Sequence, residues 1–289
     1  MGNNYITMNK RIFAIASDFL NNHECFVTEK MIKEITDIGF SVKDAYKILV
    51  ASFYDIDYLD DSNDKILYQE YFEKIFAEQI NSEYEKDLYY QNIKFYNKKI
   101  GNCEIKYDSY KPYEAFVYND IERYINGKQI PKIGFFRKEF KYPAIYENNR
   151  LWMSVTPNEI NTMKEPIKKA FGKVLMYGLG IGYIAYMVSL KEDVEKIIII
   201  EKNKKIIDLF YEEIYPQFEN KEKIEIICED AFIYADKKMG KENFDFVFCD
   251  LWHDVSDGLP MYLKMKEYES RNPKSIYMYW IEKSIKCYL

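Results

Sequence analysis

The sequence predicts an α/β protein whose C-terminal half is built on a parallel β-sheet. Short apolar runs rich in β-branched and aromatic residues end in acidic residues, and segments of helix length separate them; the runs are 197–201 (IIIIE), 224–230 (IEIICED) and 244–250 (FDFVFCD). This alternation of buried strands and amphipathic helices is typical of a parallel sheet covered on both faces. A further apolar run at 173–177 begins the series and leads into a glycine-rich turn.

The glycine turn is GLGIG at 178–182, and a helix-like segment begins near Tyr183. Gly178, Gly180 and Gly182 let the backbone turn sharply and let a ligand approach where a Cβ atom would collide. The helix that follows directs N–H groups toward the same place. This strand, glycine turn and helix predict a nucleotide site.

Acidic residues end the three strands that follow. Ligands of parallel sheets bind beyond the carboxyl ends of the strands, so we expect Glu201, Asp230 and Asp250 to share one edge with the glycine turn. An ionised carboxylate only accepts hydrogen bonds and can take both hydroxyl protons of a ribose. Each acid could instead be a solvated strand end or a helix cap, but in register with the glycine turn they favour nucleotide binding.

The spacing of the glycines narrows the choice of nucleotide. A dinucleotide site usually carries GxGxxG, whereas this chain has GxGxG. This turn, with Glu201 after the second strand, Asp230–Ala231 after the third and Asp250 after the fourth, resembles the class I S-adenosylmethionine-dependent methyltransferase superfamily. The likeness covers roughly residues 140–289.

Within that superfamily the chain is most similar to the spermidine-synthase-like branch. Many methyltransferases have an acid two residues before the first glycine, whereas this chain has Met176, and an apolar residue is common there in this branch. The segments 151–160 (LWMSVTPNEI) and 250–254 (DLWHD) look like those of uncharacterised bacterial members of the branch.

The resemblance implies a Rossmann-like, class I methyltransferase-like domain at 156–289 that binds S-adenosyl-L-methionine at the glycine turn. Glu201 would accept hydrogen bonds from the ribose hydroxyls, and Asp230 would accept one from the adenine amino group. The Ala231 amide would meet the adenine ring, and Asp250 would complete the cofactor site.

The chemistry is expected just after the fourth strand, in DLWHDVSDG at 250–258. The His253 imidazole could take a proton from an attacking amine or hydroxyl, which makes Asp250 and His253 the predicted catalytic residues. Asp250 or Asp254 could orient His253 or hold a cationic substrate, and Trp252 could wall the pocket or face a sulfonium. His253 could equally be a loop histidine bonded to a backbone carbonyl. We expect no metal site.

Methyl transfer to an unidentified small molecule or protein side chain is therefore the expected activity. An aminopropyltransferase using decarboxylated S-adenosylmethionine is the alternative, although DLWHD does not reproduce the Asp-Ser/Thr-Ser/Thr-Asp-Pro gate of spermidine synthases. The Asn/Asp-Pro-Pro-aromatic motif of amino-directed nucleic-acid methyltransferases is absent too. A third hypothesis is a non-catalytic scaffold whose helical module binds a partner.

Two segments are expected before the nucleotide domain. Residues 1–101 predict a helical module, because apolar residues recur at intervals of three and four, and its helices are expected at 8–22, 28–40 (N-cap Thr28), 41–56 (N-cap Ser41) and 64–80. Residues 102–155 predict a small β-rich connector of hairpins, with turns that include Asn126-Gly127 and Asn148-Asn149.

The nucleotide domain itself should open and close on helices. Thr156 is expected to cap a helix that runs to Phe171, with Asn158 and Glu159 as cap residues or as contacts to the methionine end of the ligand. After Asp250, a helix at 259–269 and one further strand or helix near 276–282 suggest a sheet shortened at its C-terminal end.

Composition excludes several other classes of protein. The chain has 289 residues, 48% of them hydrophobic, and its net charge of −6 comes from acids interspersed with lysines, so no basic patch indicates nucleic acid. No apolar run is long enough for a membrane helix and no signal peptide is evident, which makes the cytoplasm the expected location. Five scattered cysteines argue against disulfides and zinc, and Cys228 and Cys249 are expected in buried strands. A small-molecule substrate is expected, and a homo-oligomer is left open.

Overall fold

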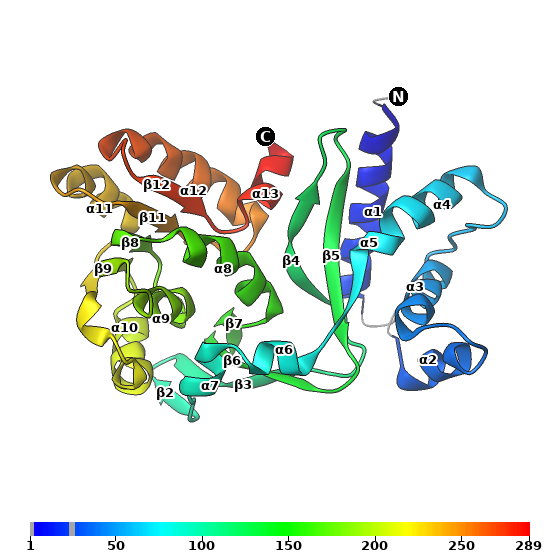
Figure 1. Ribbon diagram of the computed structural model, residues 1–289, viewed down its shortest axis with the longest axis horizontal. Helices are drawn as coiled ribbons and strands as arrows, with labels where there is room; N and C mark the ends of the chain where they lie inside the picture. The colour runs from blue at the N-terminus through cyan, green and yellow to red at the C-terminus, as the bar shows by residue number, and fades with distance from the viewer. Residues whose placement is uncertain (1–2, 23–26) are drawn as a thin grey trace. The chain divides into compact units, whose positions relative to one another are not determined.

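A computed structural model describes residues 3–22 and 27–289, and Cys25 lies outside these residues. The chain divides into two compact units. The helical unit comprises Met1–Glu83 and Ser109–Lys141, and the sheet unit comprises Tyr84–Asp108 and Tyr142–Leu289 (Figure 1). Of the connector expected at 102–155, residues 109–141 belong to the helical unit and the remaining residues to the sheet unit.

The helical unit begins with the helices that the sequence predicts. They are α1 (Asn3–Asn21), α2 (Glu29–Thr36), α3 (Val42–Phe53), α4 (Ser62–Leu67), the π-helical η1 (Tyr68–Phe72) and α5 (Glu73–Ile75). Thr28 and Ser41 are confirmed as N-caps, since their hydroxyls accept hydrogen bonds from the N–H groups of Met31 and Asp44. Aliphatic and aromatic side chains together form the core of this unit, where the rings of Tyr46 and Phe135 stack with their centroids 3.9 Å apart.

The end of the helix predicted at 64–80 is wrong. Phe76–Gln79 forms strand β1, which pairs in parallel with β5 (Gln129–Phe136), and β5 pairs in antiparallel with β4 (Phe116–Arg123). Phe76 is buried by this pairing at 2% exposure. The helical spacing of apolar residues continues through this segment, but tertiary pairing with a strand more than fifty residues away overrides it.

Helix α6 (Asn81–Glu85) spans the boundary between the two units, and α7 (Leu88–Asn92) lies in the sheet unit. A small four-stranded sheet follows, with β2 (Lys98–Ile100), β3 (Cys103–Tyr110), β6 (Phe140–Glu147) and β7 (Arg150–Ser154) in the order β2-β3-β6-β7. Asn148 and Asn149 both have positive φ, at 53° and 64°, between β6 and β7. The predicted turn is thereby confirmed, because consecutive positive φ values are typical of a tight hairpin.

The rest of the sheet unit is an α/β structure on a parallel sheet. Its elements are α8 (Pro157–Lys169), β8 (Gly172–Tyr177), α9 (Tyr183–Ser189), β9 (Val194–Glu201), α10 (Lys204–Leu209), η2 (Phe210–Ile214), η3 (Tyr215–Gln217), η4 (Lys221–Lys223), β10 (Ile224–Cys228), α11 (Ala231–Lys237), η5 (Met239–Lys241), β11 (Phe246–Cys249), α12 (Val255–Glu267), η6 (Tyr268–Arg271), β12 (Ile276–Tyr279), α13 (Glu282–Ile285) and η7 (Lys286–Tyr288). The segment near 276–282 thus supplies a strand and then the start of a helix.

All five strands of this sheet are parallel, in the order β10-β9-β8-β11-β12. Figure 1 shows α11 and α12 on one side of the sheet and α9 and α10 on the other. Leu175, Tyr177 and Val247 share a buried cluster with residues of α11 and α12. The strand order reverses between β8 and β11, and in open parallel sheets such a reversal leaves room for a ligand at the carboxyl ends.

Cys228 and Cys249 were both expected in buried strands, and the structure confirms burial for Cys249 only. Cys249 is buried in β11, but Cys228 is exposed. Cys228 is the last residue of β10, which stands at the edge of the sheet and pairs with β9 alone in the strand order. An edge position leaves the end of the strand open to solvent.

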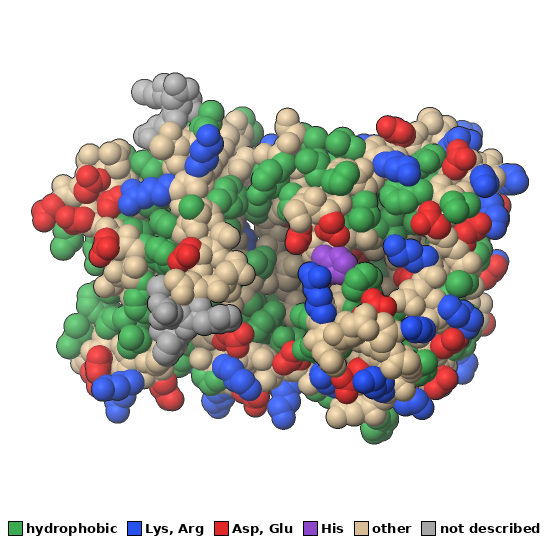
Figure 2. Space-filling view, turned by 180° about the vertical axis from the view of Figure 1, so that it is seen from behind, with side chains coloured by type: hydrophobic (Ala, Val, Ile, Leu, Met, Phe, Trp, Pro, Cys, Tyr) green, Lys and Arg blue, Asp and Glu red, His purple; other side chains and the backbone are tan. Residues whose placement is uncertain are grey.

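The distribution of surface charge and the length of the helices are relevant to binding of nucleic acids and membranes. Acidic and basic side chains are intermixed over the face drawn in Figure 2. Among the described residues, no helix combines the length and the apolar composition that crossing a bilayer requires.

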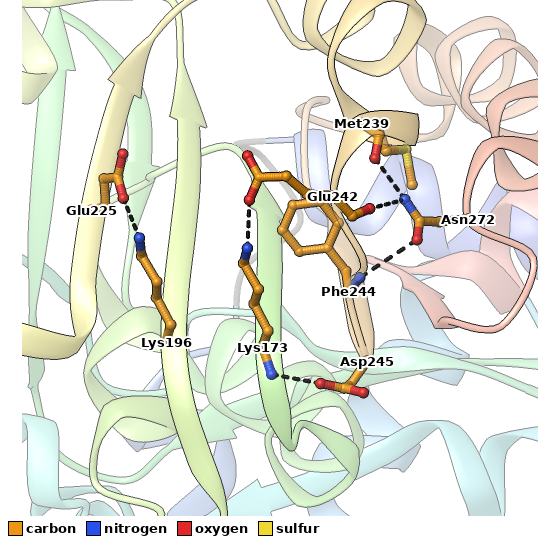
Figure 3. Close-up of polar contacts among 8 residues, drawn as sticks. All are labelled: Lys173, Lys196, Glu225, Met239, Glu242, Phe244, Asp245 and Asn272. Carbon is orange, nitrogen blue, oxygen red and sulfur yellow. Dashed lines mark hydrogen bonds and ion pairs between the residues drawn. The ribbon is translucent and has the colours of Figure 1, made fainter.

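The amino ends of the parallel strands are held by polar contacts, drawn in Figure 3. The Lys173 side chain forms an ion pair with Glu242, and the Lys173 N–H donates to the Asp245 carboxylate at 2.8 Å. Buried Asn272 donates from Nδ2 to the carbonyls of Met239 and Glu242, at 2.6 and 2.9 Å. Its Oδ1 accepts from the Phe244 N–H at 3.4 Å. We call this region the amino edge.

Candidate functional site

The glycine turn follows β8 directly, and its backbone requires glycine. Gly178, Gly180 and Gly182 have φ values of 99°, 59° and 79°. A Cβ atom on Gly178 would lie 2.1 Å from the backbone oxygen of Asp250, whereas one on Gly180 would meet only the Met153 sulfur, at 4.0 Å. Gly178 is therefore fixed by close packing, while the space beside Gly180 is open to a ligand.

Two contacts hold the turn in place. The Gly178 N–H donates to the Ile200 carbonyl at 3.0 Å, which continues the ladder between β8 and β9. The Tyr89 hydroxyl, from α7, donates to the Ile181 carbonyl. Tyr89 is fully buried, and no local sequence pattern predicts its contact with the turn, because the two residues lie far apart along the chain.

The structure brings Glu201 to the glycine turn, as predicted. One oxygen of its carboxylate accepts from the Leu179 N–H at 3.2 Å and the other from the Asn203 N–H at 2.7 Å. Each carboxylate oxygen has a second lone pair, so both can accept another hydrogen bond. Glu201 is thus oriented by the backbone and remains able to bind a diol.

Asp230 and Ala231 lie at the beginning of α11. The Asp230 carboxylate caps this helix, with Oδ1 accepting from the N–H groups of Phe232 and Ile233 at 2.9 and 3.1 Å. Ala231, the first residue of the helix, is 6% exposed. The helix-cap alternative for Asp230 therefore describes this structure, and a contact with adenine stays a prediction.

Asp250 stands beside the first glycine. Its N–H donates to the Tyr177 carbonyl at 2.9 Å, which extends the pairing of β11 with β8 to the start of the turn. Removal of water by the surrounding protein raises the pKa of Asp250 to about 7. Asp250 therefore lies beside the glycine turn, as predicted, and has a pKa near neutrality.

The charges of Glu159 and Asp250 interact, and we call these two acids the carboxyl pair. Desolvation raises the pKa of Glu159 well above its usual value, and the negative charge of Asp250 raises it further. Thr156 stands at the N-cap of α8, as expected, but makes no cap hydrogen bond through its side chain. Glu159 was expected as a cap residue or as a contact to the methionine end of the ligand, and the second role stays a prediction. In the same turn of α8, the buried Oδ1 atom of Asn158 has no hydrogen-bond partner among the described residues. α8 ends at Lys169, short of the predicted Phe171, because Ala170 is already extended.

His253 lies on the loop after β11, and its orienting partner differs from those expected. The ring nitrogen Nδ1 lies 3.2 Å from the Asp257 carboxylate, on α12. Asp254 is the N-cap of α12 and accepts from the Ser256 N–H at 2.7 Å. The prediction that Asp250 or Asp254 orients His253 is therefore corrected to Asp257. The signal in the sequence was the spacing of four residues between His253 and an acid in the first turn of a helix.

Trp252 is a core residue. It is 5% exposed, its ring stacks on Tyr279 with centroids 6.5 Å apart, and it packs closely against Gly258. The expectation that Trp252 walls a substrate pocket is corrected, because its side chain points into the cluster under α12. The aromatic residue beside His253 is instead Trp152 of β7. Its ring packs edge-to-face with the imidazole, and the two ring centroids lie 4.3 Å apart.

Comparisons with known proteins identify no relative of this chain. No protein-family model matches the chain, and no curated protein matches it in sequence. Within residues 3–22 and 27–289, no cluster of three or more His, Cys, Asp or Glu side chains is arranged to hold a metal ion.

Proposed function

We propose that the chain is an S-adenosylmethionine-dependent methyltransferase that acts on a small molecule or a protein side chain. The observation that carries the proposal is the hydrogen bond from the Leu179 N–H to Glu201. It joins the middle of the glycine turn to the acid that ends the neighbouring strand. One nucleoside could therefore lie against the turn and reach the Glu201 carboxylate with its ribose.

The strand order supports the same proposal. The turn follows β8 at the point where the order β10-β9-β8-β11-β12 reverses, which is where Rossmann-like sheets bind nucleotides. Asp230 and Asp250 follow the strands that the class I methyltransferase resemblance requires. The open space beside Gly180 is what a bound ligand needs.

The residues present fit this cofactor, which supplies a methyl group on a cationic sulfur. The chain itself would bind the ribose at Glu201, hold the adenine near Asp230 and Ala231, and align the methyl acceptor. Alignment accounts for much of the acceleration in such a transfer. The carboxyl pair of Glu159 and Asp250 would favour a positive charge nearby, because a cation offsets their mutual repulsion.

The first test is calorimetric titration with S-adenosylhomocysteine. We expect binding in the micromolar range that Glu201→Gln weakens by roughly ten- to a hundredfold, since hydrogen bonds to a charged acceptor contribute about 1.5 to 3 kcal/mol. Glu225→Gln is the matched control, because Glu225 is exposed and pairs only at the surface with Lys196 (Figure 3). No heat and no thermal stabilisation of the wild type would favour the scaffold hypothesis.

The carboxyl pair also gives the aminopropyltransferase alternative a specific basis. Two neighbouring carboxyls could bind the ammonium group of a polyamine. Titration with decarboxylated S-adenosylmethionine separates the two reactions. Tighter binding of the decarboxylated nucleotide than of S-adenosylmethionine would support aminopropyl transfer, and the reverse preference would support methyl transfer.

A further inference from the structure

The Asp257 carboxylate receives a convergent set of hydrogen bonds at the start of α12. The backbone N–H of His253 lies 3.2 Å from both carboxylate oxygens, and the N–H of Asp254 donates to Oδ1 at 3.0 Å. These bonds leave the carboxylate little freedom to rotate. The His253 Nδ1 atom reaches Oδ2 from the same side, at 3.2 Å.

Asp257 is ionised at neutral pH. Burial would raise the pKa of this carboxyl, but the N–H of Asp254 and the ring and N–H of His253 outweigh burial, and the pKa falls below its usual value. An ionised carboxylate can only accept hydrogen bonds. The proton between Asp257 and His253 must therefore sit on Nδ1, which leaves Nε2 of the neutral ring with its lone pair.

A second element limits rotation of the ring. Trp152, from β7, meets the imidazole with an interplanar angle of 79°. His253 nonetheless keeps 41% of its side chain exposed, so the ring is oriented without being buried.

We propose that Asp257 is a positioning residue that holds His253 as the Nδ1–H tautomer, so that Nε2 serves as the base toward the methyl acceptor. This inference rests on the proposed methyltransferase function and narrows its substrate class. The acceptor atom carries a proton that it loses in the reaction, as a hydroxyl or an amine N–H does. A thioether or a tertiary amine has no such proton and gains nothing from this arrangement.

The step balances in atoms and charge. The acceptor's lone pair forms the new bond to the methyl carbon while the sulfur–methyl bond breaks and leaves its electron pair on sulfur. The acceptor's proton passes to His253 Nε2, and Asp257 stabilises the resulting imidazolium. The imidazolium then returns its proton to water.

The test is the tautomer of His253, read from long-range ¹H–¹⁵N correlation spectra of the whole chain with ¹⁵N-labelled histidine, at a pH where the ring is neutral. The chain has 2 histidines, so His253→Gln assigns the signals. We expect Nδ1–H to be the major tautomer in the wild type. In Asp257→Ala the major tautomer should become Nε2–H, which free imidazole side chains prefer.

Asp254→Ala is the matched control, because Asp254 and Asp257 form the two halves of the capping box of α12 and only Asp257 contacts the ring. It should weaken the helix cap and leave the tautomer unchanged. An Nε2–H majority in the wild type, or an unchanged tautomer in Asp257→Ala, would overturn the proposal. The wild-type spectrum decides this even if Asp257→Ala does not fold.

The readout needs no cofactor, so its failure is distinct from a failure to bind S-adenosylhomocysteine. Once an acceptor is known, Asp257→Ala and His253→Gln should both lower turnover and leave S-adenosylhomocysteine affinity unchanged. Methylation of a thioether or tertiary amine would contradict the inferred acceptor class.

Discussion

The two edges of the parallel sheet differ in how their charged side chains are arranged. At the amino edge, Lys173 pairs with Glu242, Lys196 pairs with Glu225 at 2.6 Å, and the three polar groups around Asn272 are all bonded to it (Figure 3). At the carboxyl edge, which includes the glycine turn and Glu201, the carboxyls of Glu159 and Asp250 both have raised pKa values, and the charge of Asp250 contributes to the rise at Glu159. Opposite charges are paired at the amino edge, whereas the charges of the two acids at the carboxyl edge repel each other. Under the proposed function, a bound cation or nucleoside would complete that site.

The glycines at the two ends of β8 also differ, in what surrounds their Cα atoms. Gly172 opens the strand at φ 59° and Gly178 follows it at φ 99°. A Cβ atom would meet the Asp245 side chain at the first position and the Asp250 backbone at the second, 2.2 and 2.1 Å away. The Asp245 side chain can move aside, whereas the Asp250 backbone, which directly follows the central strand β11, cannot.

The largest expected effect is therefore that of Gly178→Ala. We expect a loss of about 3 to 4 kcal/mol of stability, from the positive φ and the clash with Asp250, and loss of measurable S-adenosylhomocysteine binding. Gly172→Ala should cost about 2 kcal/mol and leave the affinity unchanged. Chemical denaturation and calorimetry measure the two effects, and equal affinities in the two variants would contradict the assignment of the turn.

Removal of the amide at the amino edge should have the next largest effect. Asn272→Ala leaves three backbone groups without their partner, and we expect a loss of about 2 to 3 kcal/mol of unfolding free energy with unchanged S-adenosylhomocysteine affinity. Asn243→Ala, at an exposed position of the same edge, should change stability by less than about 0.5 kcal/mol. A weaker affinity in Asn272→Ala would mean that the two edges are coupled.

A pH dependence of the stability is expected from the carboxyl edge. The pKa of Asp250 is raised to about 7 in the folded chain, against about 3.9 when unfolded. The folded state therefore binds more protons between these values. The stability from this group is complete below about pH 4 and is lost as the pH rises through about 7, with a slope of up to about 1.4 kcal/mol per pH unit.

Asp250→Asn should reduce that slope, and denaturation from pH 5 to pH 8 measures it. Glu159→Gln should reduce it as well, because it removes one raised carboxyl and the negative charge beside the other. The same slope in the wild type and both variants would contradict a paired arrangement of these acids.

The sequence by itself determined the local parts of this protein. β-branched runs gave the strands of the parallel sheet, hydroxyl residues gave the caps at Thr28 and Ser41, and the spacing of Gly178, Gly180 and Gly182 predicted a turn that requires positive φ. The position of Glu201 followed as well, since the carboxyl ends of parallel strands share one edge. All these features depend on residues close together along the chain or on a rule of sheet topology.

Tertiary structure alone decided what depends on distant segments meeting. It turned the end of a predicted helix at Phe76 into a strand beside β5, brought the charge of Asp250 within range of Glu159, and supported the turn with Tyr89. It also buried Trp252 and chose Asp257 from several nearby acids as the partner of His253. The physical reason is that burial, desolvation and hydrogen-bond geometry are set by neighbours in space, and a local pattern of residues does not specify them.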